Sequence, residues 1–143
     1  AGFLTERDYR EHVLPYSVRI LEEIQGEIPR IHFGVGTGEI LGAMSEAGSE
    51  VMGVDWRVPL DVAATRIAAA SGPKVLQGNL DPAMLFAGRT VLSQEVARIK
   101  AEAAAAIDAG DATGHIFNLG HGVLPNTPAE AITETVAIIH EEH

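Results

Sequence analysis

The chain has 143 residues, of which 46% are hydrophobic and 21% are charged, a composition typical of one folded domain. Its 10 basic and 20 acidic residues give a formal net charge of −10, which argues against nucleic acid or an anionic membrane as the main partner. The absence of cysteine excludes disulfides, thiolate nucleophiles and cysteine-ligated zinc. No spanning or signal-peptide pattern occurs in these residues, so we expect a cytoplasmic protein.

Helical segments and short apolar runs alternate along the chain. A helical segment over residues 6–25, interrupted at Pro15, comes first. Four strand candidates follow, each bounded by glycine or proline, at residues 30–35, 51–56, 74–79 and 114–119. Helices are expected between and after them at 39–46, 60–70, 93–109 and 127–140, with a short turn at 82–86. The last helix should begin with Thr127 as N-cap, Pro128 in the first turn and Glu130 at the third position.

This alternation predicts an α/β fold with four parallel strands in sequence order and flanking helices. Polar or glycine-rich residues follow nearly every strand, at Gly34–Glu39, Asp55–Arg57, Asn79–Asp81 and Asn118–His121. When every strand end contributes such residues, a closed (β/α)₈ barrel is favoured over an open sheet, which gathers its site at one switch point. A barrel needs about 250 residues. Residues 1–143 would therefore be a single unit that forms half of one.

His121 is the strongest candidate for a functional side chain. It lies between Gly120 and Gly122 directly after an apolar strand, so little side-chain cover is expected. A histidine inside a strand, such as His32 or His115, more often belongs to the core. Imidazole can donate a hydrogen bond to a ligand or carry a positive charge near neutral pH. We therefore expect His121 to contact a ligand at the strand ends.

The neighbouring strand ends are expected to support this site. The supporting residues are Asp55, Asn79, Asn118 and Gly120. Asn79 can also act as a structural brace, because its side chain can hydrogen bond to backbone groups and fix a loop. Trp56, the only tryptophan, is expected to pack against a neighbouring loop. No spacing of histidine, aspartate and glutamate resembles a metal site, so no metal is expected.

The glycine-rich turn Gly34–Gly38 leaves a second interpretation open. Together with Asp55 at the end of the next strand, it resembles the cofactor half of S-adenosylmethionine-dependent methyltransferases, which are open-sheet domains. In those enzymes the turn admits the cofactor and the acid holds the ribose hydroxyls. His32 stands where they usually carry an acid, and this interpretation explains only residues 34–55. A flexible turn in a barrel explains the same residues.

Taken together, four motifs resemble the uroporphyrinogen decarboxylase family. They are His32–Glu39, Gly53–Leu60, Gln77–Pro82 and Phe117–Pro125, and their order and spacing match the family over the whole chain. The resemblance implies a (β/α)₈ barrel enzyme, a homodimeric carboxy-lyase without cofactor or metal. It would remove carboxyl groups from the four acetate side chains of uroporphyrinogen, a tetrapyrrole, and give coproporphyrinogen in haem and related tetrapyrrole biosynthesis.

The resemblance also implies how the chemistry is divided. In that family a protonated pyrrole ring accepts the electrons released with CO₂ and an aspartate stabilises it, while arginines, a tyrosine, a serine and a histidine hold the substrate carboxylates. By motif, that histidine is His121. No position here matches the arginines, the aspartate or the tyrosine, so the chain is expected to be the C-terminal half of the barrel, without catalytic residues and inactive without the N-terminal half. A non-catalytic half-barrel binding module is the remaining alternative.

Overall fold

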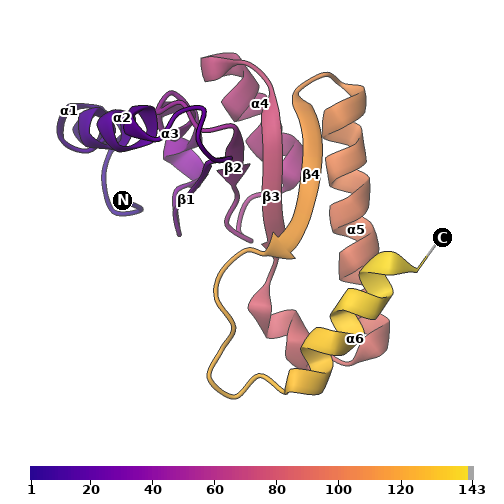
Figure 1. Cartoon of the computed structure of the whole chain (residues 1–143). Coiled ribbons are helices and arrows are strands. Elements are labelled where there is room, and N and C mark those ends of the chain that lie inside the picture. Colours follow the sequence, from indigo (N-terminus) through magenta and orange to yellow (C-terminus); the bar gives the residue numbers. More distant parts are fainter. Residues whose placement is uncertain (142–143) are drawn as a thin grey trace.

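The computed structural model describes residues 1–141, and its centre is one sheet of parallel strands. The strands are β1 (Ile31–Phe33), β2 (Val51–Gly53), β3 (Lys74–Leu80) and β4 (Ala112–Leu119). They lie in the order β1-β2-β3-β4, and each neighbouring pair is parallel. In Figure 1 the long strands β3 and β4 run side by side in the same direction. The expected parallel pairing in sequence order is therefore confirmed.

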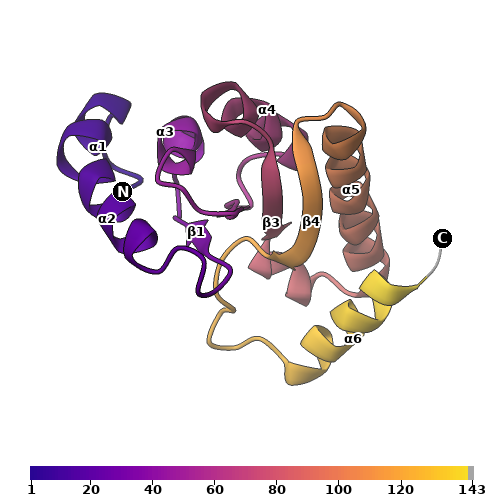
Figure 2. The same ribbon diagram turned by 45° about the horizontal axis from the view of Figure 1, so that its top comes forward.

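Helices precede the sheet and connect its strands. α1 (Glu6–His12) and α2 (Leu14–Glu23) come before β1, and the break between them falls beside the expected interruption at Pro15. The later elements are the 3₁₀ turn η1 (Gly38–Ile40), α3 (Leu41–Ser45), α4 (Leu60–Ser71), the 3₁₀ turn η2 (Pro82–Phe86), α5 (Arg89–Asp108) and α6 (Ala129–His140). Figure 2 shows the helices in an arc around the strands.

The core lies between the sheet and the arc of helices. Met52 of β2 and Leu76 of β3 are fully buried, as are Ile67 of α4 and Ile99 of α5. Burying each of these side chains stabilises the fold by about 1.5–3 kcal/mol relative to leaving it in water. One face of the sheet is thus packed against the helices.

The opposite face of the sheet is open. Phe33, Gly53, Gln77 and Ile116 occupy matched positions across the four strands. Phe33 is 43% exposed and Ile116 is 42% exposed, although both are large and apolar. A layer of helices outside and strand side chains inside is the arrangement of a (β/α)₈ barrel. The structure is therefore an α/β fold with four parallel strands and flanking helices, consistent with part of such a barrel.

The first two strands are shorter than the expected ranges 30–35 and 51–56. Arg30 is buried before β1, where its guanidinium pairs with Glu50 and its backbone N–H donates to the same carboxylate at 2.9 Å. After β1, the Thr37 hydroxyl donates to the Gly34 carbonyl oxygen at 2.8 Å and closes a turn. These side chains hydrogen bond to backbone groups at both ends of the expected strand, so β1 pairs with β2 only over residues 31–33.

The two C-terminal helices begin at residues other than those expected. α5 starts at Arg89 rather than at residue 93, because Gly88 adopts a φ of +79° and turns the chain directly into the helix. The N-cap of α6 is Pro128, and no side-chain cap hydrogen bond is formed. The expected Thr127 cap is thus wrong: its hydroxyl oxygen is buried and has no hydrogen-bond partner among residues 1–141. The restricted backbone of Pro128 occupies the capping position itself.

Candidate functional site at the strand ends

Asp55 joins two of the loops at the carboxyl ends of the strands. Its side chain is only 2% exposed. The carboxylate accepts hydrogen bonds from the backbone N–H of Gly36 at 2.7 Å, from the backbone N–H of Arg57 at 2.9 Å and from Arg57 Nη1 at 2.7 Å. The glycine-rich turn after β1 is thereby tied to the loop after β2. Because these donors occupy the carboxylate, Asp55 braces the loops. The methyltransferase-like interpretation requires a free acid at this position, and Asp55 does not present one.

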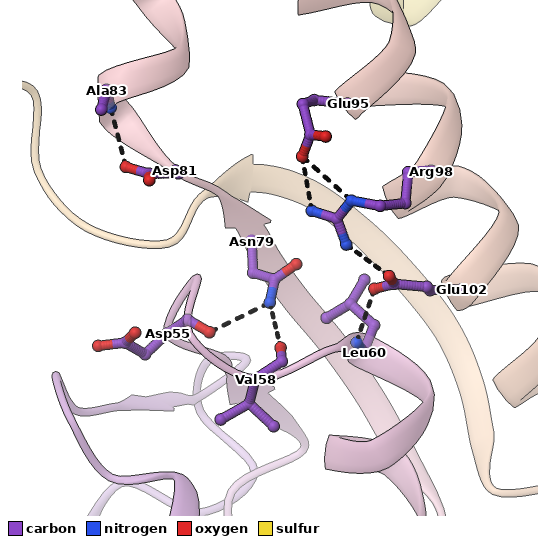
Figure 3. A network of polar contacts seen from close by, with 9 residues as sticks. All are labelled: Asp55, Val58, Leu60, Asn79, Asp81, Ala83, Glu95, Arg98 and Glu102. Carbon is purple, nitrogen blue, oxygen red and sulfur yellow. Dashed lines mark hydrogen bonds and ion pairs between the residues drawn. The ribbon is translucent and has the colours of Figure 1, made fainter.

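Asn79 connects the end of β3 to the same loop. Its side-chain amide nitrogen donates to the carbonyl oxygens of Asp55 at 3.1 Å and Val58 at 2.6 Å, as Figure 3 shows. Asn79 is 2% exposed, so these two bonds satisfy a buried amide nitrogen, while its Oδ1 atom has no hydrogen-bond partner among residues 1–141. Asp81 accepts a hydrogen bond from the backbone N–H of Ala83 at 2.9 Å and caps η2. The loop-bracing role expected for Asn79 is therefore what its contacts provide.

A second polar anchor holds the loop after β2 from the helix side. Leu60 is the first residue of α4, and its backbone N–H donates a hydrogen bond to Glu102 of α5 at 3.0 Å. Arg98 pairs with Glu102 and also with Glu95, and Figure 3 shows the three side chains together on α5. The chain between β2 and α4 is thus fixed at Asp55 on one side and at Leu60 on the other.

Gly120 brings the end of β4 against the same loop. Its backbone N–H donates to the Leu80 carbonyl oxygen at 2.8 Å. A Cβ atom at this position would lie 2.4 Å from the backbone nitrogen of Trp56, closer than real Cβ contacts come. Only glycine therefore allows the chain before His121 to approach Trp56 this closely.

His121, Trp56 and Arg57 form a cluster at the surface, with two aromatic rings and one guanidinium. The rings of His121 and Trp56 have centroids 5.6 Å apart and meet edge to face at 78°. The Arg57 guanidinium lies over the Trp56 ring, with Cζ 3.6 Å from the ring centroid. Such cation–π contacts are worth about 0.5–1 kcal/mol at exposed sites. His121 is exposed, as expected, and both the imidazole and the Arg57 guanidinium contact the indole of Trp56.

Two hollows meet at His121. One, of about 420 Å³, is lined by Trp56, Asp81, Pro82, Ala83, His121, Gly122 and Leu124. The other, of about 370 Å³, is lined by Phe33, Gln77, Asn118, Leu119, His121 and Gly122 and opens on the inner face of the sheet. Through the first hollow His121 lies beside the loops that carry Asp55 and Asn79, although those two side chains themselves are buried behind it. The role of His121 toward a ligand stays a prediction.

The remaining candidates fall into three groups. Asn118 lines the inner hollow and accepts a hydrogen bond from the backbone N–H of Leu119 at 2.8 Å. Burial lowers the pKa of His32 and of His115. Both are half-buried, and one ring nitrogen of each bonds a backbone carbonyl, so they serve the fold rather than the strand-end site. No role was expected for Arg57 from the sequence. Its position directly after an acid and a tryptophan at a strand end is the sequence feature that could have identified it as a site residue.

Neither a metal-binding cluster nor a membrane-spanning helix is present among residues 1–141. Between residues 1 and 141 no cluster of histidine, aspartate and glutamate has the geometry to hold a metal ion. Over the same range, no helix combines the length and hydrophobicity that a bilayer crossing requires.

Comparison with known proteins shows a continuous match. The sequence pattern of the uroporphyrinogen decarboxylase family matches residues 1–142. A uroporphyrinogen decarboxylase of Corynebacterium efficiens is 80% identical over 141 residues, which is 98% of this chain and 39% of the relative. Those of Corynebacterium diphtheriae and Rhodococcus erythropolis are 73% and 63% identical, again over 98% of this chain and 40% and 39% of their own lengths. The chain thus spans about 39% of the length of these curated relatives.

Proposed function

The chain belongs to the uroporphyrinogen decarboxylase family, and from this we propose that it is part of an enzyme that decarboxylates the acetate side chains of uroporphyrinogen. The product would be coproporphyrinogen, in haem and related tetrapyrrole biosynthesis, and neither a metal nor an organic cofactor would take part. The observation that carries the proposal is the unbroken match over residues 1–142, which includes all four strand-end motifs. The open His121 beside two hollows supports it.

We propose that this chain supplies substrate binding rather than the electron sink. Decarboxylation leaves an electron pair that a cationic group must accept, and the candidate acid of this chain, Asp55, already accepts three hydrogen bonds. His121 can donate a hydrogen bond to a substrate carboxylate or pair with it as imidazolium. The catalytic groups would then lie in the remainder of the protein, and this chain alone would be inactive.

On the strand-end motifs we assign these four strands to the C-terminal half of the barrel, with the N-terminal half as their partner. The edges of the sheet at β1 and β4, and the exposed side chains of Phe33 and Ile116, support the need for a partner, because unpaired strand edges and wet apolar faces recruit other chains. We extend the proposal to a homodimer of the whole enzyme in the cytoplasm. Light scattering on the 143-residue chain should show association, and a compact monomer with one sharp unfolding transition would contradict the half-barrel assignment.

The proposed activity is tested by exchanging the matching segment of a relative for this chain. The 141 matching residues of the Corynebacterium efficiens relative are replaced with this chain, and the products formed from uroporphyrinogen are separated by chromatography. We expect the hybrid to produce coproporphyrinogen and the isolated chain to produce none. Circular dichroism confirms that the hybrid is folded. A folded hybrid without activity contradicts the proposed function, and turnover by the isolated chain contradicts the assignment of catalytic groups to the remainder.

The role of His121 is tested in the same hybrid. His121→Ala should raise KM for uroporphyrinogen and slow the successive decarboxylations without unfolding the protein. His12→Ala is the matched control, because His12 lies on α1 with 66% of its side chain exposed. Unchanged turnover in all four steps for His121→Ala would remove this residue from the site.

A further inference from the structure

We propose that Arg57 is a specificity-determining residue that binds one carboxylate of the substrate, next to His121. The inference rests on the proposed function, since it names a second carboxylate contact in the same site. It is carried by three observations: the guanidinium is fixed on two sides, it remains half exposed, and it shares the Trp56 ring with the histidine.

The guanidinium of Arg57 is held before any ligand arrives. Nη1 donates to the buried Asp55 carboxylate at 2.7 Å, and the planar group lies 3.6 Å from the centre of the Trp56 ring. Asp55 is fixed in turn by the backbone N–H groups of Gly36 and Arg57. An arginine locked in this way loses little side-chain freedom on binding, and this lowers the entropic cost of each new hydrogen bond.

Donors of this guanidinium remain available. A guanidinium carries five N–H groups in a rigid plane, and within residues 1–141 its one protein acceptor is Asp55. Of the Arg57 side chain, 53% is exposed, against 2% for Asp55, so the cation faces solvent and the carboxylate lies behind it. The planar fork matches the two oxygens of a carboxylate, which explains why arginine recognises such groups in pairs of parallel hydrogen bonds.

The neighbours of Arg57 restrict what it can bind. His121 lies at the edge of the same indole, so an anionic ligand meets two hydrogen-bond donors in one place. Asp81 lines the adjoining hollow, and one of its oxygens caps η2. This negative charge disfavours a second carboxylate in that hollow. We therefore assign one carboxylate to Arg57 and His121 together, with the rest of the ligand directed toward the inner hollow beside Asn118.

A binding experiment tests this assignment on the 143-residue chain itself. Trp56 is its only tryptophan, so intrinsic fluorescence reports on the ring that carries Arg57. The probe is tricarballylate, a small polycarboxylate without absorbance of its own, and inorganic phosphate is titrated in parallel. Arg57→Gln should weaken tricarballylate binding about 10- to 100-fold, as expected for the loss of a charged hydrogen bond. Arg57→Lys keeps the charge but not the fork and should fall between.

The control is Arg7→Gln, on α1, where 85% of the arginine side chain is exposed. It should bind tricarballylate like the unaltered chain. Equal affinities for Arg57→Gln and the unaltered chain overturn the proposal, and so does tighter binding of phosphate than of tricarballylate. Circular dichroism separates loss of binding from loss of folding, and Arg57→Lys preserves the test if Arg57→Gln does not fold.

A kinetic experiment in the hybrid enzyme separates this inference from the proposed function. Arg57→Gln should raise KM for uroporphyrinogen while kcat changes little, because a contact made equally in the ground state and the transition state affects binding alone. An active hybrid with unchanged KM in the variant overturns the role of Arg57 and leaves the function standing. An inactive hybrid contradicts the function, while tricarballylate binding by the chain still tests Arg57.

Discussion

Gly120→Ala is the substitution for which the structure gives the clearest consequence. The added methyl carbon would lie 2.4 Å from the backbone nitrogen of Trp56 and 2.8 Å from its Cα and Cβ atoms. These are main-chain or near-main-chain atoms, which no rotamer change can move aside. The end of β4 must therefore separate from the loop after β2, and the hydrogen bond from Gly120 N–H to the Leu80 carbonyl is strained at the same time.

The expected cost combines two effects. Forcing a methyl group into a filled space costs about 1–3 kcal/mol, and weakening one backbone hydrogen bond adds about 1 kcal/mol. We therefore expect Gly120→Ala to lower the free energy of unfolding by about 2–4 kcal/mol. Urea unfolding followed by circular dichroism measures this difference, and Trp56 fluorescence reports separately on the altered contact.

Gly122→Ala is the matched control on the other side of His121. A Cβ atom there meets no heavy atom within 4 Å, and Gly122 is not in the left-handed region. Its free energy of unfolding should stay within about 0.5 kcal/mol of the unaltered chain, as is usual for surface positions. Equal effects of the two substitutions, or none from Gly120→Ala, would refute the argument that close backbone approach requires glycine at position 120.

Three further substitutions have defined outcomes. Asn79→Ala removes both hydrogen bonds of the buried amide and should destabilise the chain by about 1–3 kcal/mol in urea unfolding. Asn118→Ala should have little effect because Asn118 is exposed, and similar losses from the two substitutions would contradict the bracing role. Arg30 lowers the pKa of Glu50 from 4.5 to about 2, so this pair stabilises the fold above pH 4.5 and the contribution is lost as the pH falls toward 2; Glu50→Gln should flatten that dependence, and an unchanged acid profile would count against the pair. Burial lowers the pKa of His115 below 6.5, so stability should decline as the pH falls through 6.5, and His115→Gln should reduce the decline; equal slopes from pH 8 to 5 would exclude the effect.

Much of the fold could be predicted from the sequence because β3 and β4 carry strong local signals. Both are continuous runs of small and apolar residues bounded by turn residues, and both pair over most of their lengths. β1 and β2 were expected to be longer because Val35 and Val54 extend their apolar runs. β1 is instead limited by a side-chain contact to the backbone before it, and this contact joins residues far apart in sequence, Arg30 and Glu50. Local patterns carry no information about such partners.

The candidate site divides in the same way. The convergence of the strand ends follows from parallel pairing, so the neighbourhood of His121 could be predicted from the sequence. Which of these residues contact a ligand and which brace the loops could not be predicted from the sequence. An aspartate or an asparagine at a strand end can bind either a ligand or a loop, and only the burial and hydrogen bonds of Asp55 and Asn79 identify them as braces. Arg57 gains its importance from stacking on Trp56, which depends on rotamers.

The hydrogen bonds that join the strand-end loops form among residues 1–141, although Asn79 Oδ1 is buried there without a partner, whereas the apolar inner face stays uncovered. Asp55, Asn79 and Gly120 link the loops after β1, β2, β3 and β4 through hydrogen bonds or direct packing among described residues. Phe33 and Ile116 have no such cover, since more than two fifths of each is exposed. It follows that the geometry around His121 is set by contacts between neighbouring loops and does not depend on closure of the inner face. A partner that covers Phe33 and Ile116 would therefore add stability and the missing chemical groups to a binding surface that is already arranged.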